Sequence, residues 1–392
     1  MIYYILLSFF LLCTASNLSS NKNTAALTLD NYLYFITLTI LVCFAGLRFD
    51  TGWDYKGYHY YYDLIPSLDV LFGNWDVYKS IYFEPGFKML MSFSKMIGLD
   101  FYYFQFLVSL VCIVLIHKSI REEKSKLLFL FVYFTTCYLF LNMSVIRQGI
   151  AVAFLYLALT NIWSENKARC IIYILVGSLF HFSLIVLLPV ILIANKKSIS
   201  NKILYITVLG AIFIYLLEIH WLKNVFTIIS PILPHDIGYK ITTYLDSDRF
   251  GRSREIGFGL LEKIVTFVAI YRVYQSERST KNRILLRIFI FYMIVYFAFY
   301  EITVLYDRLR LYFVAVNVFV YLCIFNHYRG YNKIIAYLVI VFYSIFSFMN
   351  IFRSESNTSV FMPYYSILES ENLIPAEFKG DLRIDRAIDM DH

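Results

Sequence analysis

Four arginines stand at the edges of long apolar segments, where a charge is costly to place. They are Arg48, Arg147, Arg308 and Arg310. An arginine at the centre of a membrane helix costs about 2.5–3.5 kcal/mol on insertion scales, so such a residue usually faces a polar cavity and marks a function. The planar guanidinium binds oxyanions through two parallel hydrogen bonds. These arginines come from three distant parts of the chain, and together they predict a polyanionic ligand such as a pyrophosphate.

Each arginine also has an ordinary structural interpretation. Arg48 closes an apolar segment and could extend its charged end to the membrane surface. Arg147 and the neighbouring Gln148 lie near the start of an apolar helix, where Arg147 could instead form an internal ion pair. The ligand interpretation is favoured for Arg147 because it falls on the side of the membrane that the basic loops avoid.

Residues 46–63, GLRFDTGWDYKGYHYYYD, gather carboxylates, glycines and tyrosines in one polar loop. Carboxylates such as Asp54 beside rings such as Tyr55 and Tyr58 suit sugar recognition. A sugar has an apolar face that packs on an aromatic ring and a polar rim that hydrogen-bonds. The aromatic belt of a membrane interface is the competing interpretation. Tyr364, in a second aromatic string near the end of the chain, could close over such a site.

Three residues are candidates for a general acid or base. Asp54 belongs to the polar loop, Glu84 precedes a proline in the string YFEPGF, and His181 interrupts an apolar stretch. A carboxylate or an imidazole can take the proton of a hydroxyl group. Glu84 also fits the ordinary start of a helix, and His181 also fits a buried, hydrogen-bonded histidine. The residues alone do not choose among the three.

The composition excludes a soluble fold. Of 392 residues, 59% are apolar and 16% are charged, whereas a soluble domain carries roughly 25% charged residues. A chain with so few charged residues fits a lipid environment. Lipid requires either helices or a closed barrel, because no water is present to hydrogen-bond the backbone. Barrel strands would alternate apolar and polar residues. This chain instead has long unbroken apolar runs, which predict helices.

A membrane helix needs about 20 apolar residues, so each apolar run of about that length is a candidate span. A further stretch, residues 170–194, is interrupted by His181 and Pro189 and predicts a broken or re-entrant helix pair. We therefore predict an all-α polytopic membrane protein with about ten to twelve transmembrane helices. The candidate spans are residues 1–14, 31–47, 101–117, 126–141, 145–163, 203–219, 257–275, 284–305, 308–326 and 332–350.

Short basic loops predict which side of the membrane each segment faces, because lysine and arginine collect on the cytoplasmic side. Four such loops alternate correctly with the spans if residues 170–194 form a broken pair. This places the long loops 48–100 and 220–256 and the tail 351–392 together on the opposite side. We predict one transmembrane domain, residues 1–350, followed by that tail. The acidic end, residues 381–392, is expected to be mobile.

Several function classes are not indicated by the sequence. The net charge of +7 arises from the short loops, so a nucleic-acid partner is not predicted. The six cysteines form no close pair and predict neither a disulfide framework nor a zinc site. There is no glycine-rich nucleotide motif, and no cofactor or metal is predicted.

The order of short motifs resembles the EpsG-like branch of the Wzy family, the polymerases of bacterial O-antigen and related surface polysaccharides. These motifs span nearly the whole chain, and each keeps its place relative to the predicted helices. The matching strings are Gly46–Tyr58, Glu84–Phe87, Arg147–Ala151, His181–Ser183, Arg310–Phe313 and Pro363–Tyr364.

The resemblance implies a GT-C-like fold and a glycosyltransferase of the bacterial inner membrane. Such an enzyme moves a glycan from undecaprenyl pyrophosphate to the non-reducing end of another lipid-linked repeat unit, on the periplasmic side. Its partners would be that lipid-linked oligosaccharide and membrane lipids, with a chain-length regulator left open. The four arginines would bind the pyrophosphate, and Asp54, Glu84 or His181 would deprotonate the acceptor. The sugars would be positioned by Tyr55, Tyr58, Gln148 and Tyr364.

Two rival functions remain at this point. A flippase or transporter of lipid-linked oligosaccharide would also gather arginines in the membrane, but transporters are often built from internal repeats, and this chain has none. A membrane acyltransferase would need a histidine and an acid facing the cytoplasm. His117 is on the predicted cytoplasmic side but has no suitably placed acid, so this function is the weaker rival.

Overall fold

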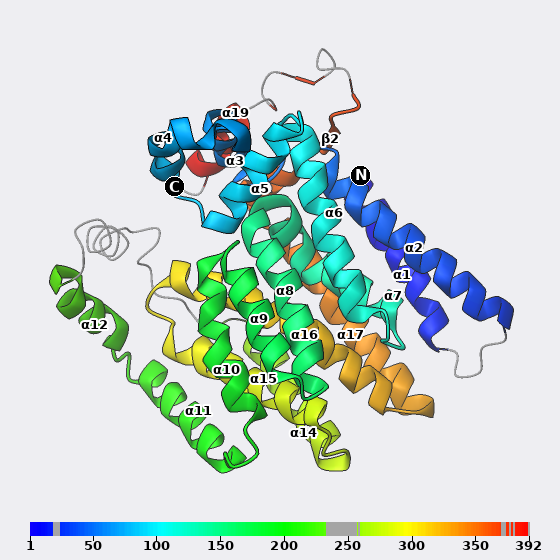
Figure 1. Ribbon diagram of the computed structural model, residues 1–392. Coiled ribbons are helices and arrows are strands. Elements are labelled where there is room, and N and C mark those ends of the chain that lie inside the picture. Colours follow the sequence, from blue (N-terminus) through cyan, green and yellow to red (C-terminus); the bar gives the residue numbers. More distant parts are fainter. Residues whose placement is uncertain are drawn as a thin grey trace. The chain divides into compact units, whose positions relative to one another are not determined.

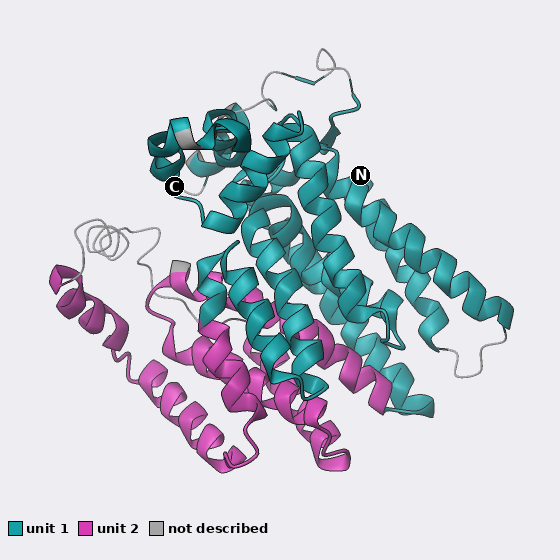
Figure 2. Cartoon of the chain, in the orientation of Figure 1, with its two compact units in different colours: residues 1–185, 328–392 teal, residues 186–327 magenta. Residues whose placement is uncertain are grey.

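The chain folds almost entirely into helices, which form two compact units (Figure 1 and Figure 2). The computed structural model describes residues 1–18, 24–232, 257, 259–369, 374, 375, 378 and 381–390. Unit 1 comprises residues 1–185 and 328–392, and unit 2 comprises residues 186–327. Unit 1 therefore includes the predicted tail as well as helices from both ends of the chain. The predicted domain boundary at residue 351 stays a prediction.

Unit 1 is built from helices and one pair of very short strands. Its first half contains α1 (Ile2–Thr14), η1 (Ala15–Leu18), α2 (Thr24–Gly46), β1 (Arg48–Phe49), α3 (Tyr55–Leu64), η2 (Leu68–Asn74), α4 (Trp75–Ser80) and α5 (Pro85–Met96). There follow α6 (Phe101–Ile120), α7 (Lys126–Tyr133), the π-helix η3 (Phe134–Ser144), α8 (Ile146–Trp163) and α9 (Lys167–Ser178). The C-terminal part contributes α17 (Gly330–Ile351), α18 (Glu355–Phe361), β2 (Tyr365–Ser366) and α19 (Asp381–Asp389).

Unit 2 is helical throughout its described residues. The helix η4 (Phe182–Val186) leads into it, and α10 (Leu187–Asn195), α11 (Asn201–Leu216), α12 (Trp221–Ile229), η5 (Ser230–Ile232), α14 (Gly259–Ser276), α15 (Thr280–Ala298) and α16 (Thr303–His327) complete it. The predicted loop 220–256 begins with α12, and its residues 233–256 lie outside the described residues.

Six helices in the described part of the chain are long and apolar enough to cross a membrane, or up to seven if one bent pair is counted as a span. The six coincide with the predicted spans 31–47, 101–117, 126–141, 145–163, 308–326 and 332–350. The bent pair, Asn201–Leu216 and Trp221–Ile232, turns by 87°. The chain is therefore an all-α polytopic membrane protein, as predicted.

The other predicted spans also form helices, but they are weaker candidates. The helix α1 has only 13 residues, fewer than the roughly 17 that a span needs. The helices α14 and α15 have 18 and 19 residues and contain several charged side chains each. The count of strong candidates is thus lower than the ten to twelve predicted, because short or charged helices meet the apolar criterion less well.

The predicted break in residues 170–194 is present. The helix α9 ends at Ser178, and η4 begins at Phe182. At the break the amide of His181 still donates to the carbonyl oxygen of Gly177 (3.2 Å), and that of Leu184 donates to the carbonyl oxygen of His181 (3.1 Å). The backbone therefore stays hydrogen-bonded while it leaves the helix, which is what a break within an apolar segment requires.

The π-helix η3 sets the start of α8. The amide of Val145 donates to the carbonyl oxygen of Phe140 at 2.7 Å, five residues back, which is the hydrogen-bond spacing of a π-helix. The next helix then begins immediately, and its backbone lies close to η3. A Cβ atom on Gly149 would lie only 2.1 Å from the carbonyl oxygen of Leu141. Glycine at this position therefore permits the tight turn that places Arg147.

Arg48 braces the loop that follows α2. Its side chain is 1% exposed, and its guanidinium donates to the carbonyl oxygens of Ala45 and, at 2.9 Å, Thr51. Burial lowers the pKa of Arg48 to about 10, so the guanidinium stays charged near neutral pH. One buried cation thus satisfies backbone carbonyl groups on both sides of the turn.

The same loop is held from the other end of the chain by Arg383 of α19. The Arg383 guanidinium donates to the carbonyl oxygens of Ser359 (2.9 Å), Asp50 (3.0 Å) and Pro363 (2.6 Å). Its side chain is 2% exposed. The expectation that residues 381–392 are mobile is therefore wrong for the described part, because a buried and fully engaged arginine docks α19 onto unit 1.

The loop also approaches the end of η3 very closely at Gly52. Its backbone has a φ of +116°, and a Cβ atom there would lie 1.9 Å from the carbonyl oxygen of Met143. We expect Gly52→Ala to lower the free energy of unfolding by about 1–3 kcal/mol through strain and displaced backbone. Thermal unfolding in detergent measures this. Gly210→Ala, where an added Cβ meets nothing within 4 Å, is the matched control and should not destabilise. Equal stability of the two variants would mean that the close approach at Gly52 does not require glycine.

Removing the Arg383 guanidinium should release α19. Arg383→Met leaves several buried acceptors without a donor, and we expect the docking of α19 to weaken by about 2–3 kcal/mol. Limited proteolysis of the purified protein should then cut the C-terminal segment much faster than in the wild type. Leu382→Ala, at a neighbouring side chain that is 59% exposed, should leave the cutting rate unchanged. Equal protection of the Arg383 variant and the wild type would refute the docking role.

Candidate functional site

Asp54 and Tyr58 lie on the first turn of α3. Asp54 occupies the position just before the helix, and the Tyr58 hydroxyl donates to its Oδ2 at 3.2 Å. Tyr58 recurs at helical spacing with Tyr55 and Tyr62, and all three are 2% exposed. The buried face of α3 is thus aromatic, and it holds one carboxylate at its start.

Glu84 stands just before α5, with Pro85 as the first residue of that helix. The turn before it is held by Lys88, whose ammonium donates to the carbonyl oxygens of Tyr78 (3.0 Å) and Ile81 (3.1 Å). Burial lowers the pKa of Lys88. The Glu84 carboxylate contacts Arg147 of α8.

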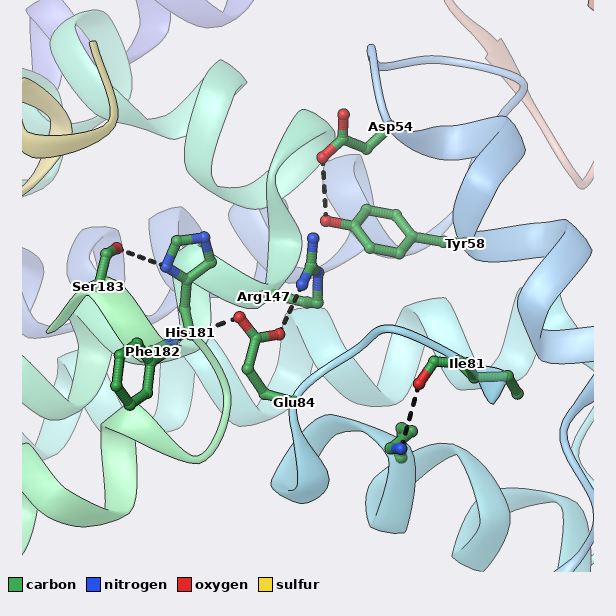
Figure 3. Close-up of polar contacts among 9 residues, drawn as sticks. Asp54, Tyr58, Ile81, Glu84, Arg147, His181, Phe182 and Ser183 are labelled. Carbon is green, nitrogen blue, oxygen red and sulfur yellow. Dashed lines mark hydrogen bonds and ion pairs between the residues drawn. The ribbon is translucent and has the colours of Figure 1, made fainter. Parts of the chain in front are cut away.

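Arg147 and Glu84 form an ion pair, with Nη1 of Arg147 2.5 Å from Oε2 of Glu84 (Figure 3). The two side chains are 11% and 17% exposed. The guanidinium also lies 4.5 Å from the ring centre of Phe83 and 5.8 Å from that of Tyr58. Its Nε makes no hydrogen bond with any residue that the structure describes. Arg147 is thus a nearly buried cation whose Nε has no partner among the described residues.

His181 joins this cluster through the break after α9. The other oxygen of Glu84, Oε1, accepts the backbone N–H of Phe182 at 3.3 Å, and Nδ1 of His181 is hydrogen-bonded to the Ser183 hydroxyl at 2.7 Å. Figure 3 shows His181, Glu84, Arg147 and the Asp54–Tyr58 pair around one region of unit 1.

Backbone contacts fix the Glu84 turn against the same break. The Gly86 amide donates to the carbonyl oxygen of Leu179 at 2.9 Å. A Cβ atom on Gly86 would lie 2.8 Å from that oxygen, so the contact depends on glycine. The strings around Asp54, Glu84, Arg147 and His181 are far apart in sequence, and the structure brings them together.

Other predicted site residues in unit 1 lie outside this cluster. Arg48 braces its own loop, and its predicted contact with pyrophosphate stays a prediction. Tyr55 is buried against Phe101, with ring centres 5.2 Å apart. Gln148 is fully buried. Tyr364 stacks on Phe44 at 4.5 Å and donates to its carbonyl oxygen at 3.1 Å, so it packs against α2.

Arg308 and Arg310 lie near the start of α16, in unit 2. Nε of Arg310 is 3.4 Å from Oδ1 of Asp307, one turn back on the same helix, and both side chains are partly exposed. The predicted convergence of these two arginines with Arg147 stays a prediction.

Some residues of the cluster were not predicted. Phe83 and Tyr82 supply the aromatic surroundings of Arg147, and Ser183 holds His181. Phe83 and Tyr82 stand next to Glu84 in the sequence, so the string YFEPGF carried that signal. In the described part of the chain no group of three or more His, Cys, Asp or Glu side chains is arranged to hold a metal ion.

The sequence was compared with known families, curated proteins and solved structures. Residues 31–366 match the EpsG family, which covers most of the chain and all the strings of the cluster. No curated protein and no solved structure matches. Membership indicates a function of the polysaccharide-polymerase type. On the extent of this match, and as the order of its motifs predicted, the chain belongs to the EpsG family, a family of Wzy-type polymerases.

Proposed function

We propose that this protein is a polymerase of O-antigen or a related surface polysaccharide in the bacterial inner membrane. It transfers a growing glycan from undecaprenyl pyrophosphate to the non-reducing end of another lipid-linked repeat unit on the periplasmic side. Family membership supports the proposal. The observation that carries it is the Arg147 cluster, where the guanidinium pairs with Glu84 and lies near Tyr58, whose hydroxyl donates to Asp54. Nε of Arg147 has no partner among the described residues.

Arg147 binds the pyrophosphate that leaves from the donor. When the bond between the sugar and the phosphate breaks, negative charge develops on the phosphate oxygen, and a preorganised donor stabilises that charge. A buried donor left unpaired costs about 1–3 kcal/mol, so a phosphate oxygen that reached Nε of Arg147 would relieve this cost. The surrounding rings restrict water near the guanidinium and strengthen the interaction.

Glu84 is best suited to holding Arg147 in position. Both of its oxygens are engaged, one by Arg147 and one by the Phe182 amide. A carboxylate with two such partners is less available to take a proton from an acceptor sugar. We therefore assign Glu84 a positioning role.

Asp54 is the favoured base. Its side chain is less buried than that of His181, which is 8% exposed, and the Tyr58 hydroxyl holds one of its oxygens. In the proposed step, Asp54 takes the proton of the acceptor hydroxyl, the acceptor oxygen bonds to the anomeric carbon, and the sugar–phosphate bond breaks. The electron pair of that bond leaves with the pyrophosphate, on which Arg147 acts.

The remaining predicted residues keep subordinate roles in this proposal. The phosphate-binding role predicted for Arg308 and Arg310, on α16 of unit 2, stays a prediction. Gln148, Tyr55 and Tyr364 support the site from within unit 1, where they are largely buried.

Replacing Arg147 by lysine tests its proposed binding of the pyrophosphate leaving group. Arg147→Lys keeps the charge but loses the planar fork, and we expect polymer formation to fall by about 10²–10³-fold. The glycan ladder of cells that carry only this variant measures the effect. Loss of a polymerase leaves a single repeat unit on the final acceptor, whereas loss of a flippase leaves none. A normal ladder from Arg147→Lys would mean that the proposed role of Arg147 is wrong.

Replacing Asp54 by asparagine tests the choice of base. Asp54→Asn should lower turnover by about 10²–10⁴-fold, the usual contribution of general acid–base catalysis. His181→Gln is the comparison and should lower turnover by less, since we assign His181 no proton transfer. Turnover is measured with the purified protein in nanodiscs and lipid-linked repeat units. A larger loss from His181→Gln than from Asp54→Asn would reverse the assignment.

A further inference from the structure

The side of α3 that faces away from the Arg147 cluster carries a second set of polar residues. Lys56, His59, Tyr60 and Asp63 recur at intervals of three, four and seven residues, so they share one face of the helix. Tyr58, which faces Arg147, is on the opposite, buried face. The two faces of one short helix therefore present two distinct chemical surfaces.

This outer face borders a cavity of about 410 Å³ within unit 1. Small-molecule sites have volumes of roughly 300–1,000 Å³, so the cavity suits a short piece of a larger ligand. Asp50 and Tyr55 line it together with the face just described. The Tyr55 side chain is 2% exposed, and its hydroxyl makes no hydrogen bond with any residue that the structure describes. A buried polar group of this kind usually has a partner such as water, an ion or a ligand.

Two residues of the cavity wall, Asp50 and His59, are held by neighbouring residues. Asp50 has a positive φ of 42°, and its carbonyl oxygen is held by Arg383 at 3.0 Å. The His59 ring stacks on Phe101, with ring centres 4.4 Å apart and planes inclined by 10°. Such a preformed site spares a ligand the cost of ordering the protein.

The charged residues that line the cavity do not favour a polyanion. Two carboxylates, Asp50 and Asp63, line it with one ammonium, Lys56, which also lies 4.0 Å from Oδ1 of Asp385. His59 lies 3.9 Å from Asp63. Because carboxylates outnumber the ammonium, pyrophosphate is a poor match for this lining. A neutral ligand rich in hydroxyl groups fits better, since hydroxyls both donate to carboxylates and accept from an ammonium.

Tyr60 adds an aromatic surface. Its side chain is 59% exposed, although it lines the cavity, so its ring is available for contact. An exposed ring beside carboxylates can pack on the apolar face of a sugar ring. The combination therefore favours a carbohydrate over other neutral polar ligands.

We infer that this cavity, lined by Asp50, Tyr55, Lys56, Gly57, His59, Tyr60 and Asp63, is a glycan-binding subsite separate from the Arg147 cluster. It holds sugars of the glycan that are remote from the reacting bond. The biological role rests on the proposed polymerase function, but the binding itself does not. Retention of a glycan at such a subsite favours further rounds of addition, so the subsite influences polymer length.

The binding test uses oligosaccharides prepared by partial hydrolysis of the host's own surface polysaccharide. Saturation-transfer NMR with the full-length protein in nanodiscs should detect binding to the wild type. Tyr60→Ala removes the ring, and we expect binding to weaken by about tenfold. Tyr60→Phe keeps the ring and should bind as the wild type does. Tyr103→Ala, at a comparably exposed tyrosine (62%) that does not line the cavity, should also bind normally.

The glycan ladder gives the second readout. Tyr60→Ala should shift the ladder toward shorter chains, and Tyr60→Phe and Tyr103→Ala should leave it unchanged. Wild-type binding and a wild-type ladder in Tyr60→Ala would overturn the subsite. This outcome is independent of pyrophosphate binding, because Arg147→Lys should lower polymer formation by about 10²–10³-fold while the oligosaccharide still binds. Normal polymer from Arg147→Lys would instead overturn the proposed function, whatever the binding result.

Discussion

The ion pair between Arg147 and Glu84 is the interaction on which the rest of the site depends. It joins the start of α8 to the turn before α5, and the second oxygen of Glu84 extends the connection to the break after α9. An unpaired charge at this level of burial would destabilise the fold strongly. The pair therefore fixes three elements relative to one another, and it leaves the Nε edge of Arg147 without a partner among the described residues.

The buried arginines of unit 1 fall into two kinds, which their partners distinguish. Arg48 and Arg383 bind backbone carbonyl groups and are almost fully buried, so they act as braces for the loop between α2 and α3. Arg147 is paired with a carboxylate, lies over aromatic rings and is partly accessible. The partners of a guanidinium thus indicate whether its role is structural or in binding. Its position at a helix end does not distinguish these two roles as well.

The sequence predicted the class of fold and much of the cluster for physical reasons that are local. Apolar length predicts helices, and a polar residue in an apolar segment predicts a special role, which is how Arg147 and His181 were found. Glu84 was found as an acid beside a proline in the polar loop 48–100. The brace by Arg383 was not predictable, because its acceptors are backbone oxygens that any sequence provides. In the described part of the chain fewer strong candidate spans are found than predicted, since the 13-residue α1 and charged helices such as α15 meet the apolar criterion less well.

The four charged or titratable candidates of the cluster each stand where a helix begins, ends or changes its winding. Asp54 precedes α3, Glu84 precedes α5, Arg147 follows the π-helix η3, and His181 lies between α9 and η4. A regular helix in lipid makes its backbone hydrogen bonds internally, whereas an interruption exposes backbone polar groups that need polar partners. A site that acts on a substrate with an apolar lipid and a polar glycan must combine both surroundings. Interrupted helices provide this combination, because they place polar side chains and backbone groups beside apolar helices.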